Sequence, residues 1–290
     1  YTSLLKKPEP DRVADLTNQS LVLHCIDNQT RYILVTSLCP VTMFTLELLR
    51  KAGIKRIHWF YEDYTRAGYW KQVVQGYDLF AGIQRGYLEK TILETGCRYI
   101  YLPVAGDRDA PEWNPDKAEK DISFVGLPTR YRIEFLEECR KAGLSIAIGG
   151  LGWDRYQGIL RDSVVHGKWL DRSGYLKITS MGKTGLNLSF KNPSETRDDT
   201  HLTPRIYDIL SMGMPLFTEN VPLLRETLPD FHYETFTCSS VCIQKIRDFI
   251  NQNIHSRISE RLRTNREGIL QNEVWKNRIE TIISEGASLV

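Results

Sequence analysis

The segment TPRIYDILSMG, residues 203–213, contains the residue types that a phosphate-binding helix needs. Thr203 is a favourable N-cap, Pro204 is a favourable first helical residue, and the closing glycine is a favourable terminator. The start of such a helix offers free N–H groups and a partial positive charge, which suit an anion. Arg205 would lie in the first turn, where a cation opposes the helix dipole unless an anion also binds, and Asp208 follows one turn later. The two side chains could contact a phosphate and a ribose diol, or they could form an ordinary ion pair on a surface helix.

Two turns that contain glycine could approach the same ligand. The stretch GLPTRYR begins at Gly126, after an apolar run, and places Arg130 and Arg132 in the first turn of the helix that follows. The stretch GGLGWD includes Gly150, which would let the backbone approach a flat ligand, and Trp153, which could wall a nucleotide. Neither stretch has the spacing of a dinucleotide-binding motif or a P-loop. A solvated turn and a tight strand-to-helix turn are the alternatives.

Few residues are candidates for acid–base chemistry. Asp63 follows an apolar run that we expect to be a strand, so it could act as a general base or cap a helix. His201 stands just before the helix at 203–213 and could donate to a phosphate or a leaving group, or it could be a surface residue. Asp107 and Asp109 have the spacing of a metal-binding pair, but they lie in a polar segment rather than at the end of a strand. We therefore expect no metal, with a helix dipole and arginines neutralising the phosphate charge.

The composition is that of an ordinary globular protein. The chain has 290 residues, 41% hydrophobic and 26% charged, and its 38 basic and 36 acidic side chains leave a formal net charge of +2. This balance argues against a nucleic-acid-binding protein, which usually has a basic excess. No apolar run reaches the ~18–20 residues that span a bilayer, and the first residues do not resemble a signal peptide. Six dispersed cysteines are typical of reduced thiols, so we expect a cytoplasmic protein. The sequence does not indicate the oligomeric state.

Apolar runs of strand length alternate along the chain with amphipathic stretches that often end at a glycine. This alternation is typical of parallel sheets covered by helices on both faces. The expected strands are 20–27, 32–38, 56–62, 79–83, 99–105, 122–127, 144–150, 164–170, 185–190, 215–219 and 232–236. The expected helices are 41–52, 66–75, 87–95, 130–142, 173–180, 203–212, 241–253, 258–269 and 273–283. The polar segment 106–120, which contains two prolines, interrupts the alternation and predicts two α/β domains with the default ligand site in the cleft between them.

Several segments also have a recognisable order and spacing. They are WFYED (59–63), YLPVAGD (101–107), ISFVG (122–126) followed by Arg130, IGGLGW (148–153), GLNLSF (185–190), PRIYDILSMGMPLFTE (204–219) and VWKNRIETII (274–283). Together they resemble the CgeB-like (spore maturation protein) group of bacterial glycosyltransferases over most of the chain. The resemblance implies the GT-B architecture, in which two Rossmann-like domains follow one another.

The resemblance also implies a domain plan. It consists of an acceptor domain at 1–110, a linker at 111–120, a nucleotide-sugar domain at 121–272, and a last helix at 273–290 that packs back on the first domain. The first domain looks short or truncated, because it lacks the opening strand and glycine-rich loop of a complete Rossmann unit.

The activity that the resemblance implies is transfer of a sugar from a nucleotide-diphosphate sugar, with a UDP-sugar favoured, to a glycan or protein acceptor. No further cofactor is expected. Arg205 falls where the family places a diphosphate contact, with Thr203 and Pro204 at the helix start, and Asp208 falls where most members have a Glu against the ribose. The acid usually found eight residues earlier is replaced by Thr200. A nucleotide-sugar epimerase and a non-catalytic protein that binds a nucleotide-sugar or a partner are the alternatives.

Overall fold

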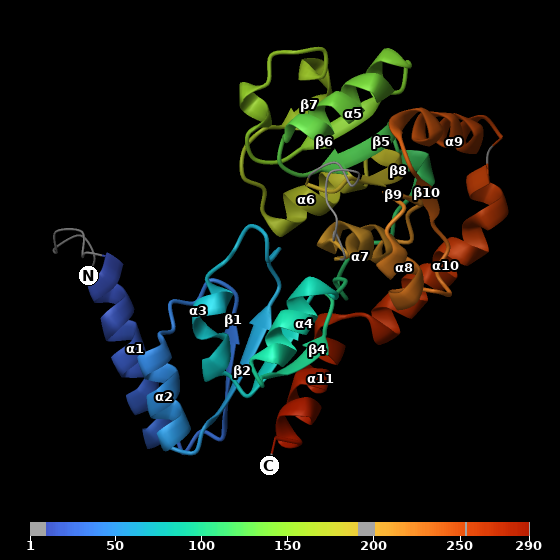
Figure 1. The fold of residues 1–290 in the computed structure, drawn as a ribbon. Coiled ribbons are helices and arrows are strands. Elements are labelled where there is room, and N and C mark those ends of the chain that lie inside the picture. The colour runs from blue at the N-terminus through green and yellow to red at the C-terminus, as the bar shows by residue number, and fades with distance from the viewer. Residues whose placement is uncertain (1–9, 191–200, 253, 290) are drawn as a thin grey trace. The chain divides into compact units, whose positions relative to one another are not determined.

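The computed structural model describes residues 10–190, 201–252 and 254–289, and it divides into two compact units (Figure 1). The first unit contains the residues up to Pro103 together with those from Ile279 onward, and the second contains Val104–Arg278. Each unit is built on one parallel sheet. The predicted fold class, two tandem Rossmann-like α/β domains with parallel sheets, is therefore confirmed. None of the helices in the described ranges is both long and apolar enough to cross a membrane.

Among the described residues, the sheet of the first unit has four strands, which pair in chain order. The strands are β1 (Tyr32–Thr36), β2 (Lys55–Phe60), β3 (Leu79–Gly82) and β4 (Arg98–Tyr101), and the helices are α1 (Pro10–Asp27), α2 (Met43–Lys51), α3 (Trp70–Val73), α4 (Tyr87–Glu94) and, from Ile279 onward, α11 (Trp275–Ala287). Successive side chains of a strand point to opposite faces, so β2 contributes to two core clusters. Ile57 packs with Ile282 of α11, whereas Phe60 packs with Trp70 and Phe80.

The first of the expected strands is wrong. Residues 20–27 form the second half of α1 rather than a strand. Asn18 and Cys25 are buried two helical turns apart, whereas Leu23 and Ile26 are 62% and 51% exposed, as one face of a helix requires. A short apolar run does not by itself distinguish a strand from a helix that is buried on one side. The sheet therefore begins at β1.

The second unit contains a six-stranded parallel sheet in the order β10-β9-β8-β5-β6-β7. Its strands are β5 (Lys120–Val125), β6 (Ile146–Gly149), β7 (Val164–His166), β8 (Gly182–Asn187), β9 (Leu216–Glu219) and β10 (Glu234–Phe236). Its helices are α5 (Arg130–Lys141), α6 (Arg172–Thr179), α7 (Pro204–Ser211), α8 (Pro222–Thr227), α9 (Ser239–Asn251) and α10 (Ile254–Asn272). Short 3-10 turns lie at Pro115–Lys117, Trp153–Arg155 and Arg161–Ser163 in this unit, and at Val74–Gly76 in the first unit. The chain builds outward from β5 to β7, returns to the other side of β5 as β8, and continues to β10, so the strand order reverses between β5 and β8.

The residues expected to form a linker, 111–120, lie inside the second unit and are packed. Trp113 is only 7% exposed. Its backbone N–H donates to the carbonyl of Met212 (2.8 Å), and its indole N–H donates to the carbonyl of Gly182 (3.0 Å). Trp113 therefore fixes this stretch on the second unit, although the polar composition of the stretch is typical of an exposed linker.

Candidate functional site

The carboxyl ends of β5 and β8 lie next to each other at the point where the strand order of the second sheet reverses. The two strands pair in parallel, with Ser123 opposite Gly185. In open α/β sheets ligands bind outside the carboxyl ends of the strands at such a reversal. Gly126 follows β5 and Leu188 follows β8, and the first turn of α7 meets both segments through Arg205.

Arg205 is a partly buried cation that is held by neutral groups. Its Nε donates to the carbonyl of Val125 (2.8 Å), and its Nη1 donates to Asn187 Oδ1 (2.8 Å) and to the carbonyl of Leu188 (3.2 Å). The guanidinium carbon lies 4.8 Å from the centre of the Phe124 ring. No carboxylate of the described residues lies within ion-pair distance of Arg205, and burial lowers its pKa. The charges of Asp208 and Glu219 act on Arg205 only from beyond ion-pair distance. A cation without a direct carboxylate partner among the described residues, in a partly dehydrated site, favours a bound anion.

Asn187 connects this arginine to the start of α7. Its Oδ1 accepts from the hydroxyl of Thr203 (2.7 Å) as well as from Arg205, and its Nδ2 donates to Thr218 Oγ1 (2.9 Å). Thr203 has the extended backbone of an N-cap (φ −75°, ψ 153°), and Pro204 is the first residue of α7. The Thr203 hydroxyl bonds to Asn187 rather than to a helix N–H, so it fixes the helix start on β8.

Gly126 and Gly150 are placed where no side chain fits. A Cβ at Gly126 would lie 2.7 Å from Arg205 Nη2 and 3.3 Å from Arg132 Nη1. A Cβ at Gly150 (φ +130°) would lie 2.5 Å from the carbonyl oxygen of Gly126. Trp153 is 1% exposed and its indole N–H donates to the same Gly126 carbonyl (2.7 Å). Trp153 is thus a buried tryptophan that fixes the backbone beside Arg205, and its role as a wall of a nucleotide site stays a prediction.

Of the two arginines expected in the first turn of α5, Arg132 rather than Arg130 lies at the reversal of strand order. The Arg130 side chain is 92% exposed, and its Nε pairs with Glu134 one turn further along the helix (2.8 Å). Arg132 is 6% exposed, and it donates to the carbonyls of Ser189 (2.9 Å) and Leu188 (2.9 Å). The residue spacing placed both in the first turn, but the face that each occupies depends on how α5 packs on the sheet.

Asp208 is buried and engaged in an ion pair, although not with Arg205. It is 4% exposed, and its Oδ1 accepts from Arg172 Nη2 (2.7 Å), while Arg172 Nε donates to Asp107 Oδ2 (2.9 Å). Burial disfavours the charge of Arg172, but the two carboxylates outweigh it and raise its pKa. Burial likewise disfavours ionisation of Asp107, but hydrogen bonds from the Asp109 N–H and from Arg172 lower its pKa overall. Asp107 is thus part of an ion-pair network that ties it to α7 through Arg172.

Sequence reasoning missed Glu219, a buried carboxylate at the carboxyl end of β9. It is 3% exposed and accepts hydrogen bonds from the Tyr131 hydroxyl (2.5 Å) and the Ser189 N–H (2.5 Å). Burial, together with the neighbouring Glu219 charge, raises the pKa of Tyr131. An acid that closes the otherwise apolar strand MPLFTE was the available signal.

The expected catalytic residues belong to different units. Asp63, in the first unit, accepts from the N–H and the hydroxyl of Thr65 (both 2.8 Å) through Oδ1, so it stabilises the turn after β2. His201 is half-buried two residues before Thr203. Thr200, where the resemblance expects an acid, lies outside the described residues. Within the described ranges no three His, Cys, Asp or Glu side chains are grouped to hold a metal ion.

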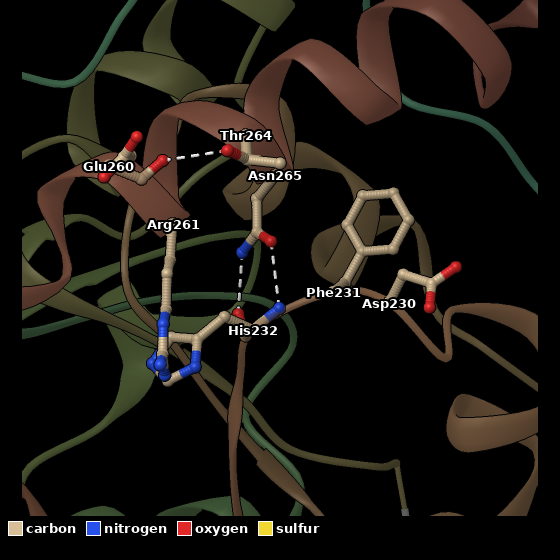
Figure 2. A pocket seen from close by; sticks show the side chains of 7 residues that line it. All are labelled: Asp230, Phe231, His232, Glu260, Arg261, Thr264 and Asn265. Carbon is tan, nitrogen blue, oxygen red and sulfur yellow. Dashed lines mark hydrogen bonds between the residues drawn. The ribbon is translucent and has the colours of Figure 1, made fainter.

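A separate cavity of about 440 Å³ lies between α10 and the segment before β10 (Figure 2). Asn265 projects from α10 and bonds both to the N–H (2.9 Å) and to the carbonyl (2.7 Å) of His232. Burial lowers the pKa of His232. The residues that line the cavity are Asp230, Phe231, His232, Glu260, Arg261, Thr264 and Asn265. It shares no residue with the cluster around Arg205.

The chain matches one protein family in sequence and several solved proteins in structure. Residues 130–284, more than half of it, match the family described as Glycosyl transferase-like. It is similar in structure to a sucrose-phosphate synthase from Thermosynechococcus elongatus (12% identity, 98% of this chain and 80% of that chain covered, TM-score 0.65). It is also similar to a trehalose-6-phosphate synthase (12% identity, 99% of this chain and 81% of that chain covered, TM-score 0.60). A third similar structure is HepE from Anabaena, solved with UDP and glucose (10% identity, 93% of this chain and 82% of that chain covered, TM-score 0.60). No curated protein sequence is significantly similar to the chain. The chain belongs to the glycosyl transferase-like family and has the GT-B fold.

Proposed function

We propose that this protein transfers a sugar from a nucleotide-diphosphate sugar, with a UDP-sugar favoured, to a glycan or protein acceptor, without a metal. The observation that carries the proposal is the Arg205 guanidinium, which is partly buried at the reversal of strand order and is held by neutral oxygens. A fixed cation of this kind stabilises the negative charge that develops on a diphosphate as the sugar–phosphate bond breaks.

In this proposal the donor diphosphate binds at the first turn of α7. Arg205 Nε and Nη1 are already engaged with neutral oxygens, and none of the described residues accepts a hydrogen bond from its Nη2. That nitrogen lies against Gly126, so a phosphate oxygen would meet it there. Arg132 adds positive charge from the adjacent helix while holding the backbone at 188–189. The exposed Arg130 is the weaker candidate of the two.

The CgeB-like assignment, the ribose contact and the leaving-group donor are part of the same proposal. Asp208 is the ribose contact that the resemblance implies, and a ribose would have to share its carboxylate with Arg172. His201, just before α7, is the candidate donor to the leaving group. Asp63 is the candidate for acceptor activation, and its Oδ1 is shared with Thr65.

A non-catalytic protein that binds a nucleotide-sugar is the second candidate. It is favoured because both carboxylates expected to act on the substrates, Asp63 and Asp208, already serve neighbouring residues in the structure. Such a protein would still bind a nucleotide-sugar at Arg205 but would not transfer the sugar.

The test is to incubate the protein with a panel of nucleotide-sugars and glycan or protein acceptors and to measure released nucleoside diphosphate. We expect release with a UDP-sugar, and a loss of on the order of 10- to 100-fold in donor affinity for Arg205→Ala, because a hydrogen bond to a charged group contributes about 1.5–3 kcal/mol. Arg140→Ala, in the exposed last turn of α5, is the matched control and should behave as the parent chain. Thermal melting verifies that the variants fold.

The outcomes separate the two candidates. Binding without release for any donor would favour the non-catalytic protein. Unchanged donor affinity in Arg205→Ala would contradict the placement of the diphosphate.

A further inference from the structure

Asn187 is one of the three residues whose oxygen atoms accept hydrogen bonds from Arg205, and its side chain is a neutral amide. Arginine offers only hydrogen-bond donors, so the atom of residue 187 that faces Arg205 Nη1 at 2.8 Å must be an acceptor. A carboxylate would satisfy the same geometry more strongly, because charge-assisted bonds are stronger than neutral ones. The chain has an amide instead.

The neighbouring hydroxyls fix the orientation of that amide. Thr218 Oγ1 donates to the carbonyl of Glu219 (3.4 Å), which leaves a lone pair of Oγ1 to accept from Asn187 Nδ2 at 2.9 Å. The Thr203 hydroxyl donates to Oδ1 on the opposite side (2.7 Å). Asn187 is 2% exposed, so its side chain is shielded from bulk solvent.

We propose that Asn187 is a positioning residue that fixes the Arg205 guanidinium without forming an ion pair with it, so that the guanidinium stays available to a bound diphosphate. The three oxygens on Arg205, from Val125, Asn187 and Leu188, are all uncharged. A carboxylate at 187 would form a buried ion pair and would compete with the ligand for the same cation. This inference rests on the proposed diphosphate site, and it assigns Asn187 a role in the strength of that site.

Asn187→Asp is the variant that adds a negative charge at this position and keeps the shape of the side chain. The side chain keeps its shape, Thr203 and Arg205 still donate to it, and the Thr218 hydroxyl can rotate to donate to the second oxygen. The variant should therefore melt at or above the temperature of the parent chain. Asn114→Asp is the matched control, because Asn114 is exposed, caps the 3-10 turn at Pro115–Lys117 in the same unit, and adds the same charge.

The experiment is calorimetric titration of UDP and of inorganic pyrophosphate into the parent chain and both variants. We expect Asn187→Asp to bind both ligands on the order of 10- to 100-fold more weakly, and Asn114→Asp to bind them as the parent does. Unchanged affinity in Asn187→Asp would overturn the inference alone, and so would loss of its fold, because an ion pair in the existing geometry stabilises it.

Failure of the proposed function looks different. A parent chain that binds neither ligand would overturn both proposals. A parent chain that binds pyrophosphate but not UDP, with the expected loss in Asn187→Asp, would uphold the role of Asn187 and contradict the nucleotide donor.

Discussion

At the scale of single residues, the distinctive feature of this chain is how it holds positive charge. Arg205 and Arg132 both donate to the carbonyl of Leu188, and both guanidinium groups lie over the ring of Phe124, at 4.8 and 5.5 Å. Gly126 lets them approach its backbone, since a Cβ there would collide with Arg205 Nη2 and crowd Arg132 Nη1. Two like charges are thus brought together on one carbonyl oxygen and one aromatic ring, an arrangement that a dianionic ligand would stabilise.

The sequence predicted part of this site. Thr203, Pro204 and Arg205 could be recognised because helix caps and first-turn charges have local signatures. The choice of Arg132 over Arg130 could not, since it depends on which face of α5 packs against β8. Asn187 and Glu219 carry no local motif either, because their importance arises from contacts with residues distant in sequence.

His58 gives a prediction for the pH dependence of stability. It is 1% exposed on β2, its ring stacks on Tyr77 (4.8 Å between centres), and burial lowers its pKa from 6.5 to about 4. The unfolded chain binds the proton more readily, so the stability from neutral His58 is complete above pH 6.5 and is lost as the pH falls towards 4. The loss amounts to about 3 kcal/mol of unfolding free energy.

Urea unfolding of the parent chain and His58→Phe between pH 7 and pH 4.5 measures this effect. Phe keeps an aromatic ring among the same neighbours and removes the titrating group. We expect the variant to lose less stability on acidification. The same pH slope in both proteins would show that His58 does not titrate as described.

At the scale of elements, α1 is the clearest difference between the predicted and observed structure. Its apolar second half is typical of a strand, but the structure has a helix there, and Asn18 joins that helix to the segment just before α2. Asn18 Nδ2 donates to the carbonyls of Ala14 and Pro40 (both 2.7 Å), and its Oδ1 accepts from the Thr42 N–H (3.1 Å). The bonds to Pro40 and Thr42 join residues more than twenty positions apart, so periodicity could not predict them.

Asn18→Ala should destabilise the first unit by about 1–3 kcal/mol, because it leaves the Thr42 N–H and the Pro40 carbonyl without this partner. The measurement is the midpoint of urea unfolding. Gln19→Ala, at an exposed neighbouring position of the same helix, is the control and should change it little. Equal effects of the two substitutions would argue against the role of Asn18.

At the scale of the whole molecule, the fold class followed from the alternation of strands and helices, and the site followed from the order of strands in one sheet. The order β7-β6-β5-β8-β9-β10 creates the reversal at which Arg205 lies, whereas the first sheet runs β1 to β4 without one. The family match begins at Arg130, so the sequence signal is concentrated in the second unit. The burial of Trp113 escaped prediction, because a single aromatic residue in a polar stretch has no periodicity to reveal it.

The central claim is that the cation at the start of α7 binds a diphosphate. A crystal structure of the protein with UDP tests it most directly. We expect a phosphate oxygen within about 3 Å of Arg205 Nη2, while Nε and Nη1 keep their bonds to Val125 and Asn187. A UDP bound elsewhere, with Arg205 still contacting only its neutral oxygens, would contradict it.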